Sequence, residues 1–290
     1  MSDERVYSVI GGDMRSGYVA QLLIEQGRRV MTAGLELSGL VAPPHINTVD
    51  DAARRADIVI LPLPLIDKNG QLKDGFSSEK IDVFSILSMV KQRAWVFGGM
   101  IPAEVQSFAD ERGVCLSDYY LRGDFLIKNA LPTAEGTVET LMKKLPITIF
   151  SSSVAVVGFG RCGEAVSLLL KGMGARVTVY ARRKETLARA ECLGLKAKQT
   201  DALYSERLSC DALVNTVPAR VITKAALDRL STSAVVVDLA SAPGGVDFAY
   251  AAKRGIDAFL APSLPGRVAP KTAGKIIIET VLNILDEKGE

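Results

Sequence analysis

Short runs of Val, Ile and Ala alternate along the chain with stretches whose apolar positions recur at helical spacing. This alternation predicts βαβ units, because a parallel strand can only be reached through a crossover segment. In the second half, the pattern predicts strands near 154–158, 176–180, 212–216, 234–238 and 257–260. Between them it predicts helices near 161–173, 184–193, 223–230 and 247–254.

The chain carries this plan twice. Residues 9–30 read VIGGDMRSGYVAQLLIEQGRRV and residues 156–177 read VVGFGRCGEAVSLLLKGMGARV, with matching glycines and no gap. Further on, ADIVILPLP in the first half matches CDALVNTVP in the second, which aligns Asp57 with Asp211. We therefore predict an α/β protein of two Rossmann-like domains, each a doubly wound parallel sheet. This architecture resembles that of the two-domain D-2-hydroxyacid dehydrogenases.

The expected domains are an N-terminal domain over 1–130 and a nucleotide-binding domain over 131–271. A helix that begins with the sequence PTAEG, with Thr133 as its cap, and ends near Lys144 is expected to join them. The last apolar stretch, 272–290, predicts a helix that returns to the N-terminal domain.

The second copy holds a glycine fingerprint between a predicted strand and a predicted helix. In such a loop the first glycine permits the tight turn, the second lets the backbone approach a pyrophosphate, and the third allows close helix packing. The helix N-terminus then offers free N–H donors to the phosphates. The residues predicted to hold a dinucleotide here are Gly158, Phe159, Gly160, Arg161, Cys162 and Gly163.

The first copy has the same loop with one decisive change. Asp13 stands where the second copy has Gly160, and its carboxylate would obstruct and repel a pyrophosphate. We therefore expect the N-terminal domain to have the fold without the dinucleotide. Two interpretations of Asp13 and Arg15 stay open: they face the cleft between the domains, or they form a pair that stabilises the loop.

The residues after the next predicted strand favour NADP over NAD. NAD enzymes place an acidic residue there to bind the ribose 2′-hydroxyl. Here the strand ends in Ala181, Arg182 and Arg183, with no acid before Glu185. Guanidinium groups bind a 2′-phosphate, whereas a carboxylate repels it. The alternative is that both arginines are merely solvated.

Ligands of open parallel sheets lie beyond the carboxyl ends of the strands. Two later loops follow predicted strands and are therefore expected to border the ribose or the nicotinamide. Their predicted cofactor-binding residues are Asn215, Thr216, Val217, Pro218, Leu239, Ala240 and Ser241. A nicotinamide cofactor implies hydride transfer, for which the protein must orient a substrate.

The candidates for catalysis are few. His45 is the only histidine and has no evident carboxylate partner, which counts against the histidine-dependent 2-hydroxyacid dehydrogenases. An anionic substrate requires cations, for which Arg15, Arg267 and Lys271 are the candidates. Glu135 is a candidate base, although it would equally stabilise the first turn of a helix.

Composition narrows the function further. The net charge is +2, from 35 basic and 33 acidic residues, which disfavours a nucleic-acid partner. Four cysteines without a CxxC pair and a single histidine predict no metal site. Such sparse thiols suit a reducing cytoplasm, and no uncharged run is long enough to span a membrane.

One long segment carries a family resemblance. The run DLASAPGGVDFAYAAKRGIDAFLAPSLPGRVAPKTAG (238–274) resembles the matching part of the A subunits of bacterial dipicolinate synthase. The motifs GGDMR, PTAEG, GFGRCG and NTVP agree with that family in order and spacing. The resemblance implies an NAD(P)-dependent oxidoreductase that acts on a CH–CH donor and oxidises dihydrodipicolinate to dipicolinate.

The same resemblance implies a setting and partners. It indicates a small dicarboxylate substrate, a flavoprotein-like B subunit, and a place in the mother cell of a sporulating bacterium. We also expect a homo-oligomer. Two alternatives remain: another two-domain dehydrogenase, related to 2-hydroxy-acid or alanine dehydrogenases, or a non-catalytic subunit that binds NADP.

Overall fold

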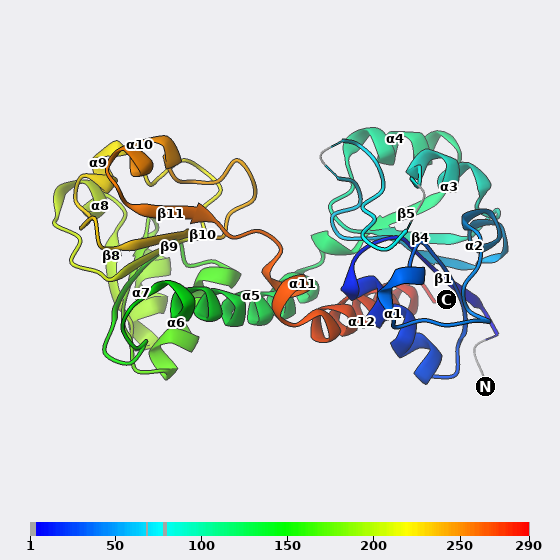
Figure 1. The fold of residues 1–290 in the computed structure, drawn as a ribbon, viewed down its shortest axis with the longest axis horizontal. Helices are drawn as coiled ribbons and strands as arrows, with labels where there is room; N and C mark the ends of the chain where they lie inside the picture. Colours follow the sequence, from blue (N-terminus) through cyan, green and yellow to red (C-terminus); the bar gives the residue numbers. More distant parts are fainter. Residues whose placement is uncertain (1–3, 68, 78–79, 290) are drawn as a thin grey trace. The chain divides into compact units, whose positions relative to one another are not determined.

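The computed structural model describes residues 4–67, 69–77 and 80–289 and divides into two units. Unit 1 comprises the chain up to Lys128 and returns from Ala269 to the C-terminus, and unit 2 comprises Asn129–Val268. Each unit is a parallel sheet with helices on its faces (Figure 1). Within the described residues, no helix has the length and apolar character needed to cross a membrane.

Unit 1 contains a five-stranded parallel sheet in the order β2-β1-β3-β4-β5. Its strands are β1 (Val6–Ile10), β2 (Arg29–Ala33), β3 (Ile58–Ile60), β4 (Trp95–Gly98) and β5 (Cys115–Asp118). Its helices are α1 (Met14–Glu25), α2 (Val49–Arg55), α3 (Val83–Met89), α4 (Ala103–Glu111), α12 (Pro270–Glu287) and the 3-10 turns η1 (Glu36–Ser38) and η2 (Tyr119–Leu121). The helix α5 (Gly123–Lys144) begins in unit 1 and continues into unit 2.

Unit 2 contains a six-stranded parallel sheet in the order β11-β10-β9-β6-β7-β8. Its strands are β6 (Ser153–Val157), β7 (Arg176–Ala181), β8 (Lys196–Gln199), β9 (Ala212–Asn215), β10 (Val235–Asp238) and β11 (Asp257–Leu260). Its further helices are α6 (Arg161–Gly172), α7 (Lys184–Cys192), α8 (Ala202–Ser205), α9 (Lys224–Leu227), α10 (Phe248–Lys253) and α11 (Leu264–Val268). This is the strand order of dinucleotide-binding domains, so the predicted fold class is confirmed.

One strand of unit 2 is absent from the sequence prediction. β8 pairs with β7 at the edge of the sheet, and its sequence Lys-Ala-Lys-Gln has no apolar run. An edge strand is covered on fewer sides than a central one, so it does not need the Val-rich composition on which the prediction relied. The other five predicted strands agree with β6, β7, β9, β10 and β11 to within about two residues, as expected for element boundaries.

The predicted start of the joining helix is wrong. α5 begins at Gly123, and Pro132 lies inside it. Thr133 is no cap, because its hydroxyl donates to the carbonyl of Asn129, one turn back, at 2.8 Å. Proline usually marks the start of a helix, because it has no N–H to donate to the preceding turn. Here the helix continues through Pro132 because side chains before and after it, including Phe125 and Val138, are buried.

The sequence repeat corresponds to a structural repeat. The Asp57 carboxylate accepts from the backbone N–H of Val6, at the start of β1, at 2.8 Å. Its counterpart Asp211 accepts from the N–H of Ser153, at the start of β6, at 2.7 Å. The two aspartates that the sequence repeat aligns thus accept the same backbone hydrogen bond, at the start of the first strand of each unit.

The C-terminal helix α12 belongs to the core of unit 1. It packs against α1 (Figure 1), with Ile277 and Val281 in the same apolar cluster as Val19. A Cβ added at Gly274 would lie 2.7 Å from the carbonyl oxygen of Arg15, so the two helices are in close contact there. The last segment of the chain therefore completes the first unit.

Candidate functional site

The three glycines of the unit 2 loop have the three separate roles expected of a dinucleotide fingerprint. Gly158 has φ +93°, and a Cβ there would lie 2.4 Å from the hydroxyl of Thr216. A Cβ on Gly163 would lie 2.2 Å from the carbonyl oxygen of Gly158, so α6 packs directly on the turn. A Cβ on Gly160 would meet nothing within 4 Å. The space beside Gly160 is therefore open for a ligand.

The N-terminus of α6 is not capped by a side chain. Its N-cap residue is Gly160, which has no side chain that could accept from the N–H groups of the first turn. The first-turn N–H groups of a helix have no partner inside the helix, and they carry its positive dipole end. The arrangement therefore suits a diphosphate, and the exposed Arg161 begins the helix beside it.

Not every residue of the loop points to a ligand. The Phe159 side chain is buried in the apolar core of unit 2, so only its main chain remains available. Burial raises the pKa of the Cys162 thiol, which keeps it neutral and unreactive. The prediction that Cys162 is simply a small residue at the helix start agrees with this environment.

The end of β7 has the basic character that the sequence indicates. Ala181 is buried at the end of the strand, and Arg182, Arg183 and Lys184 follow it as exposed residues. Within the described chain, none of these three cations has an ion pair or hydrogen bond to another side chain, so all three are available to a ligand.

The loops after β9 and β10 are held by a buried polar pair that sequence reasoning did not find. Asp238 is fully buried and accepts from the Asn215 amide at 2.8 Å and from the N–H groups of Ala240 and Gly245 at 3.0 and 2.6 Å. Asn215 also donates to the carbonyl of Val217 at 2.9 Å. The pair fixes both loops at the carboxyl edge of the sheet.

This polar pair changes what the predicted loop residues can do. The Asn215 amide is fully used inside the protein, and the Thr216 hydroxyl donates to the carbonyl of Val157 at 3.0 Å. Their side chains therefore shape the loops. The more exposed Pro218 and Ser241 lie farther out on the same two loops, with Val217, Leu239 and Ala240 between. Cofactor contact by these residues remains a prediction.

The equivalent loop of unit 1 is filled by the protein itself. Arg15, 5% exposed, donates to both carboxylate oxygens of Asp13, at 2.9 and 2.7 Å, and also to the carbonyl of Leu63. Lys73 donates to the same carboxylate at 3.0 Å. The structure shows the loop-stabilising pair, and the interpretation that these residues face the cleft between the domains stays a prediction.

A second segment covers this loop. Gly75 donates its N–H to the carbonyl of Gly12 at 2.9 Å, and Leu72 packs so closely on Gly11 that a Cβ there would lie 2.7 Å from its Cδ2. The segment containing Lys73 thus lies across the turn that, in unit 2, is open. No sequence signal pointed to this contact, because the segment is about sixty residues away from the loop.

The Asp13 carboxylate is kept ionised by its partners. Burial alone would raise its pKa, but the hydrogen bonds and positive charges of Arg15 and Lys73 outweigh burial and lower the pKa to about 2. The group is therefore an anion paired with two cations, and Arg15 uses its Nε and Nη2 donors on Asp13 and on the carbonyl of Leu63.

The other catalytic candidates are exposed and are not held by partners. Glu135 lies in the middle of α5, so its interpretation as a first-turn residue is wrong. Arg267 ends α11, and Lys271 begins α12. In the described residues, none of the three side chains has an ion pair or hydrogen bond. Their part in catalysis remains a prediction.

His45 has a structural environment. Its Nδ1 lies 3.0 Å from the carbonyl oxygen of Val30, and its own carbonyl accepts from the N–H of Thr32 at 2.7 Å. It therefore ties a loop to the edge of β2. Among the described residues there is also no group of three side chains suited to hold a metal ion.

Comparison with known proteins identifies both halves. Residues 132–244 match the family model of the D-isomer specific 2-hydroxyacid dehydrogenase NAD-binding domain, and residues 6–120 match that of the N-terminal domain of the dipicolinate synthase A subunit. The chain is 34% identical over 283 residues to the dipicolinate synthase A subunit of Bacillus subtilis, which covers 97% of this chain and 95% of the relative. The chain belongs to the dipicolinate synthase A-subunit family.

Solved structures agree with this membership. The dipicolinate synthase A subunit from Bacillus halodurans superposes with a TM-score of 0.90 at 31% identity, covering 98% of this chain and 99% of that one. D-lactate dehydrogenase from Escherichia coli superposes with a TM-score of 0.63 at 15% identity, over 98% of each chain, which shows a shared fold. Unit 2 is thus a nicotinamide dinucleotide domain of the dehydrogenase type.

Proposed function

We propose that this protein transfers a hydride from dihydrodipicolinate to NADP. The substrate loses a hydride to the nicotinamide and a proton to a base or to solvent, which gives aromatic dipicolinate and NADPH. The observation that carries the proposal is the open glycine loop of unit 2 in a chain of the dipicolinate synthase family. The cofactor supplies the hydride acceptor, and the protein supplies binding and orientation.

The chain's own residues have distinct parts in this proposal. The N–H groups at the start of α6 bind the diphosphate beside Gly160, and the Asn215–Asp238 pair keeps the nicotinamide-side loops rigid. Arg267 and Lys271 are proposed to bind the substrate carboxylates, because a dicarboxylate needs cations that are not already paired. Glu135 is proposed as the proton acceptor. Arg15 is assigned no part in substrate binding.

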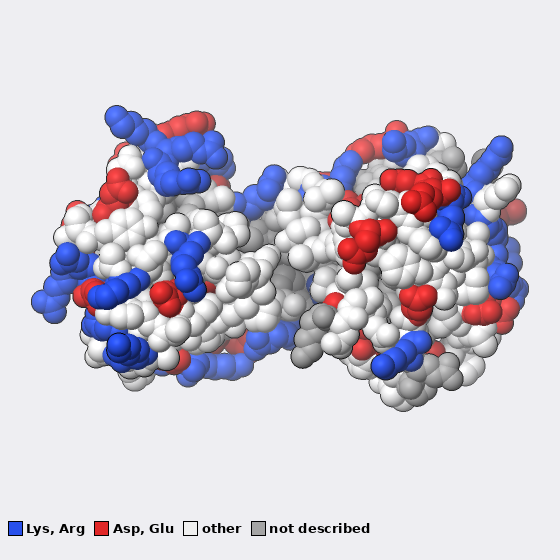
Figure 2. Space-filling model, turned by 90° about the horizontal axis from the view of Figure 1, so that it is seen from above, with Lys and Arg blue, Asp and Glu red and all other residues white. Residues whose placement is uncertain are grey.

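The choice of NADP rests on charge. Unit 2 has 18 Lys and Arg against 12 Asp and Glu, a net charge of +6, whereas the rest of the chain has 17 against 21, a net charge of −4. Figure 2 shows basic side chains spread over unit 2 on the face in view, while acidic side chains gather on unit 1. With Arg182 and Arg183 after β7, this favours a nucleotide with an additional phosphate.

Substitution of Arg182 tests the cofactor choice. Arg182→Asp should weaken NADP binding by about tenfold or more and strengthen NAD binding, because the carboxylate repels a 2′-phosphate and accepts from a 2′-hydroxyl. Lys253→Gln removes an exposed charge elsewhere in unit 2 and should change neither affinity. An unchanged NADP preference in Arg182→Asp would refute the assignment of this residue.

An activity assay tests the reaction. We expect dipicolinate and NADPH to form when dihydrodipicolinate and NADP are added, either with this chain alone or with the proposed flavoprotein-like B subunit. Binding of NADP without turnover, even with the B subunit, would favour a non-catalytic role. Turnover of 2-oxo acids with NADPH would favour another dehydrogenase activity. The proposed setting is the cytoplasm of the mother cell of a sporulating bacterium, as a homo-oligomer.

A further inference from the structure

A cavity lies in unit 2, at the opposite end of the strands that lead to the glycine loop. It is lined by Ser153 and Arg176, the first residues of β6 and β7, and by Cys210, just before β9. The glycine loop follows the carboxyl end of β6, about 16 Å of strand away. This cavity is therefore separate from the place where a dinucleotide is expected.

The cavity exists because this part of the sheet is poorly covered. β8 pairs only with the last four residues of β7, beginning at Thr178. The crossover that follows contains only the four-residue helix α8. The result is a groove of about 480 Å³, within the usual size range for small-molecule sites. Its apolar floor includes Ala155, Leu195 and Leu208, which are all buried.

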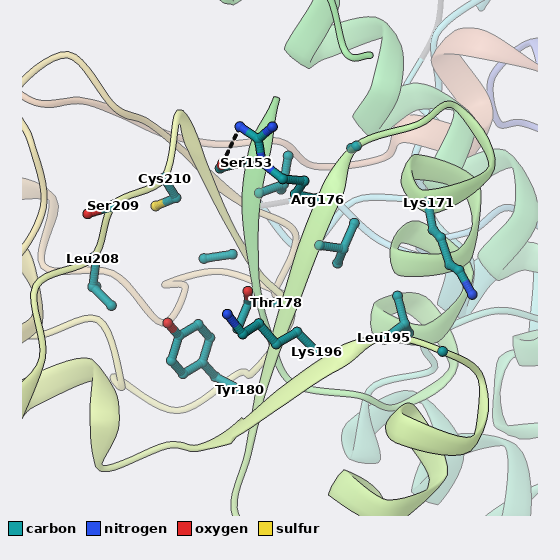
Figure 3. Close-up of a pocket in the computed structure, with 15 residues that line it drawn as sticks. Ser153, Lys171, Arg176, Thr178, Tyr180, Leu195, Lys196, Leu208, Ser209 and Cys210 are labelled. Atoms are coloured by element: carbon teal, nitrogen blue, oxygen red, sulfur yellow. Dashed lines mark hydrogen bonds between the residues drawn. The ribbon is translucent and has the colours of Figure 1, made fainter. Parts of the chain in front are cut away.

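Tyr180 is the polar group that points to a ligand. The residue is 6% exposed, its ring lines the groove (Figure 3), and within the described chain its hydroxyl has no hydrogen-bond partner. The oxygen itself is not among the fully enclosed polar atoms that lack a partner, so it is open to the groove and can donate there to a ligand or to water. Burial raises the pKa of Tyr180 to about 12, so the hydroxyl is a neutral donor near pH 7.

The charged residues that line the groove are all basic. Two carboxylates lie close by: Asp211 accepts from the N–H of Ser153 at 2.7 Å, and Glu206, which is paired with Lys198, acts on Tyr180. Lys171, Arg176 and Lys196 line it, and none of the lining residues is acidic. Arg176 donates to the Ser153 hydroxyl at 3.1 Å, and Lys171 to a backbone carbonyl, but in the described part of the chain none of the three has an ion pair. Burial also raises the pKa of Cys210 to about 12, so the thiol adds no negative charge.

The donors lie at two ends of the groove. Figure 3 shows Tyr180, Lys196 and Thr178 at one end and Arg176 at the other. The lining also includes the apolar residues Ala155, Leu195 and Leu208. We propose that this groove binds a small dicarboxylate with a flat, apolar body. One carboxylate accepts from Tyr180 and Lys196, the other from Arg176, and the body rests on the apolar floor.

The test uses benzene-1,3-dicarboxylate and calorimetry on the full chain with saturating NADP. This probe has no hydride to give, so it cannot turn over. Because Arg267 and Lys271 are proposed to bind the same kind of dicarboxylate, the titration is done in an Arg267→Gln, Lys271→Gln background, in which the groove is the remaining proposed site. We expect one molecule per chain, with benzoate and inorganic phosphate at least about tenfold weaker because each loses one end or the floor. Tyr180→Phe and Arg176→Gln should each weaken binding about tenfold.

Two matched control variants test whether a loss of probe binding is specific to the groove. Tyr250→Phe and Lys253→Gln remove a hydroxyl and a charge from unit 2 outside the groove, and both should bind the probe as the unchanged chain does. The proposal would be overturned by an absence of binding at millimolar probe, by displacement of the probe by NADP, or by Tyr180→Phe and Arg176→Gln variants that bind normally. Benzoate or phosphate binding as tightly as the probe would also contradict it.

Discussion

At the scale of single residues, one side chain separates the two glycine loops. Gly160 and Asp13 have similar backbone conformations, with ψ −165° and −166°. A Cβ on Gly160 would point into open space, whereas the Asp13 side chain caps α1 and binds Arg15 and Lys73. The same turn is thus open to a phosphate in one unit and occupied by an internal ion cluster in the other.

Gly160→Asp should copy the unit 1 arrangement into unit 2. Because space is open there and φ is negative, the variant should fold normally while NADP affinity falls more than about 100-fold through repulsion of the diphosphate. Gly163→Ala is the contrasting variant. Its Cβ would clash with the Gly158 carbonyl, so it should lose about 3 kcal/mol or more of stability. Titration with NADP and thermal unfolding would separate the two effects.

If Gly160→Asp were destabilised as strongly as Gly163→Ala, the space beside Gly160 would have a structural role, and its assignment to the diphosphate would be wrong.

Asp13 should make the stability of unit 1 depend on pH. Its folded pKa of about 2 lies below the ordinary value of 3.8, so its contribution is present above pH 4 and is lost as the pH falls toward 2. Asp13→Asn should therefore lose about 2 kcal/mol or more at pH 7, and this difference should shrink in acid. Trp95, the only tryptophan, lies in β4 and reports the unfolding of unit 1 in urea. A difference that stays constant from pH 7 to 3 would contradict the assignment.

At the scale of elements, the helix that closes the chain stabilises the sheet that opens it. α12 packs on α1 through Gly274. Two of its ion pairs join it to the first part of α5 and the residue before it: Arg122 with Glu287 at 2.6 Å and Lys128 with Glu279 at 2.7 Å. These pairs are partly exposed and contribute little, so the apolar contact between the helices is the main stabilising interaction.

Gly274→Ala tests this contact. The added Cβ would lie 2.7 Å from the Arg15 carbonyl and 3.0 Å from the Tyr18 Cβ, and the resulting overpacking should cost about 1–3 kcal/mol despite the better helix propensity of alanine. Lys275→Ala, at the next and exposed position, should be nearly neutral. Urea unfolding followed by Trp95 fluorescence measures both. Equal stability of the two variants would show that α12 does not pack closely on α1.

At the scale of the whole molecule, a duplicated fold is expected to bind a single dinucleotide. Unit 2 has the open loop and the positive net charge, while unit 1 has a filled loop and a negative net charge. We therefore predict one NADP per chain by calorimetry. Asp13→Gly should still bind only one, because Lys73 and Leu72 remain across the loop. Two nucleotides per unchanged chain would contradict the proposed difference between the units.

The features that depend on neighbours along the chain could be predicted from the sequence. The repeat, the parallel α/β fold, the open loop at Gly160 and the missing acid after Ala181 follow from short patterns, because strand alternation, turn sterics and local charge act over a few residues. The aligned aspartates Asp57 and Asp211 belong here too, since the repeat alone matched their positions.

The contacts between distant segments could be found only in the folded chain. Lys73 donates a hydrogen bond to Asp13, which is sixty residues away in the sequence, and Asn215 donates one to Asp238, which is twenty-three residues away. The continuation of α5 through Pro132 and the groove at Tyr180 likewise depend on which elements cover them. Such contacts are set by how the elements pack, and no local pattern of side chains specifies which distant residue arrives to fill a given space.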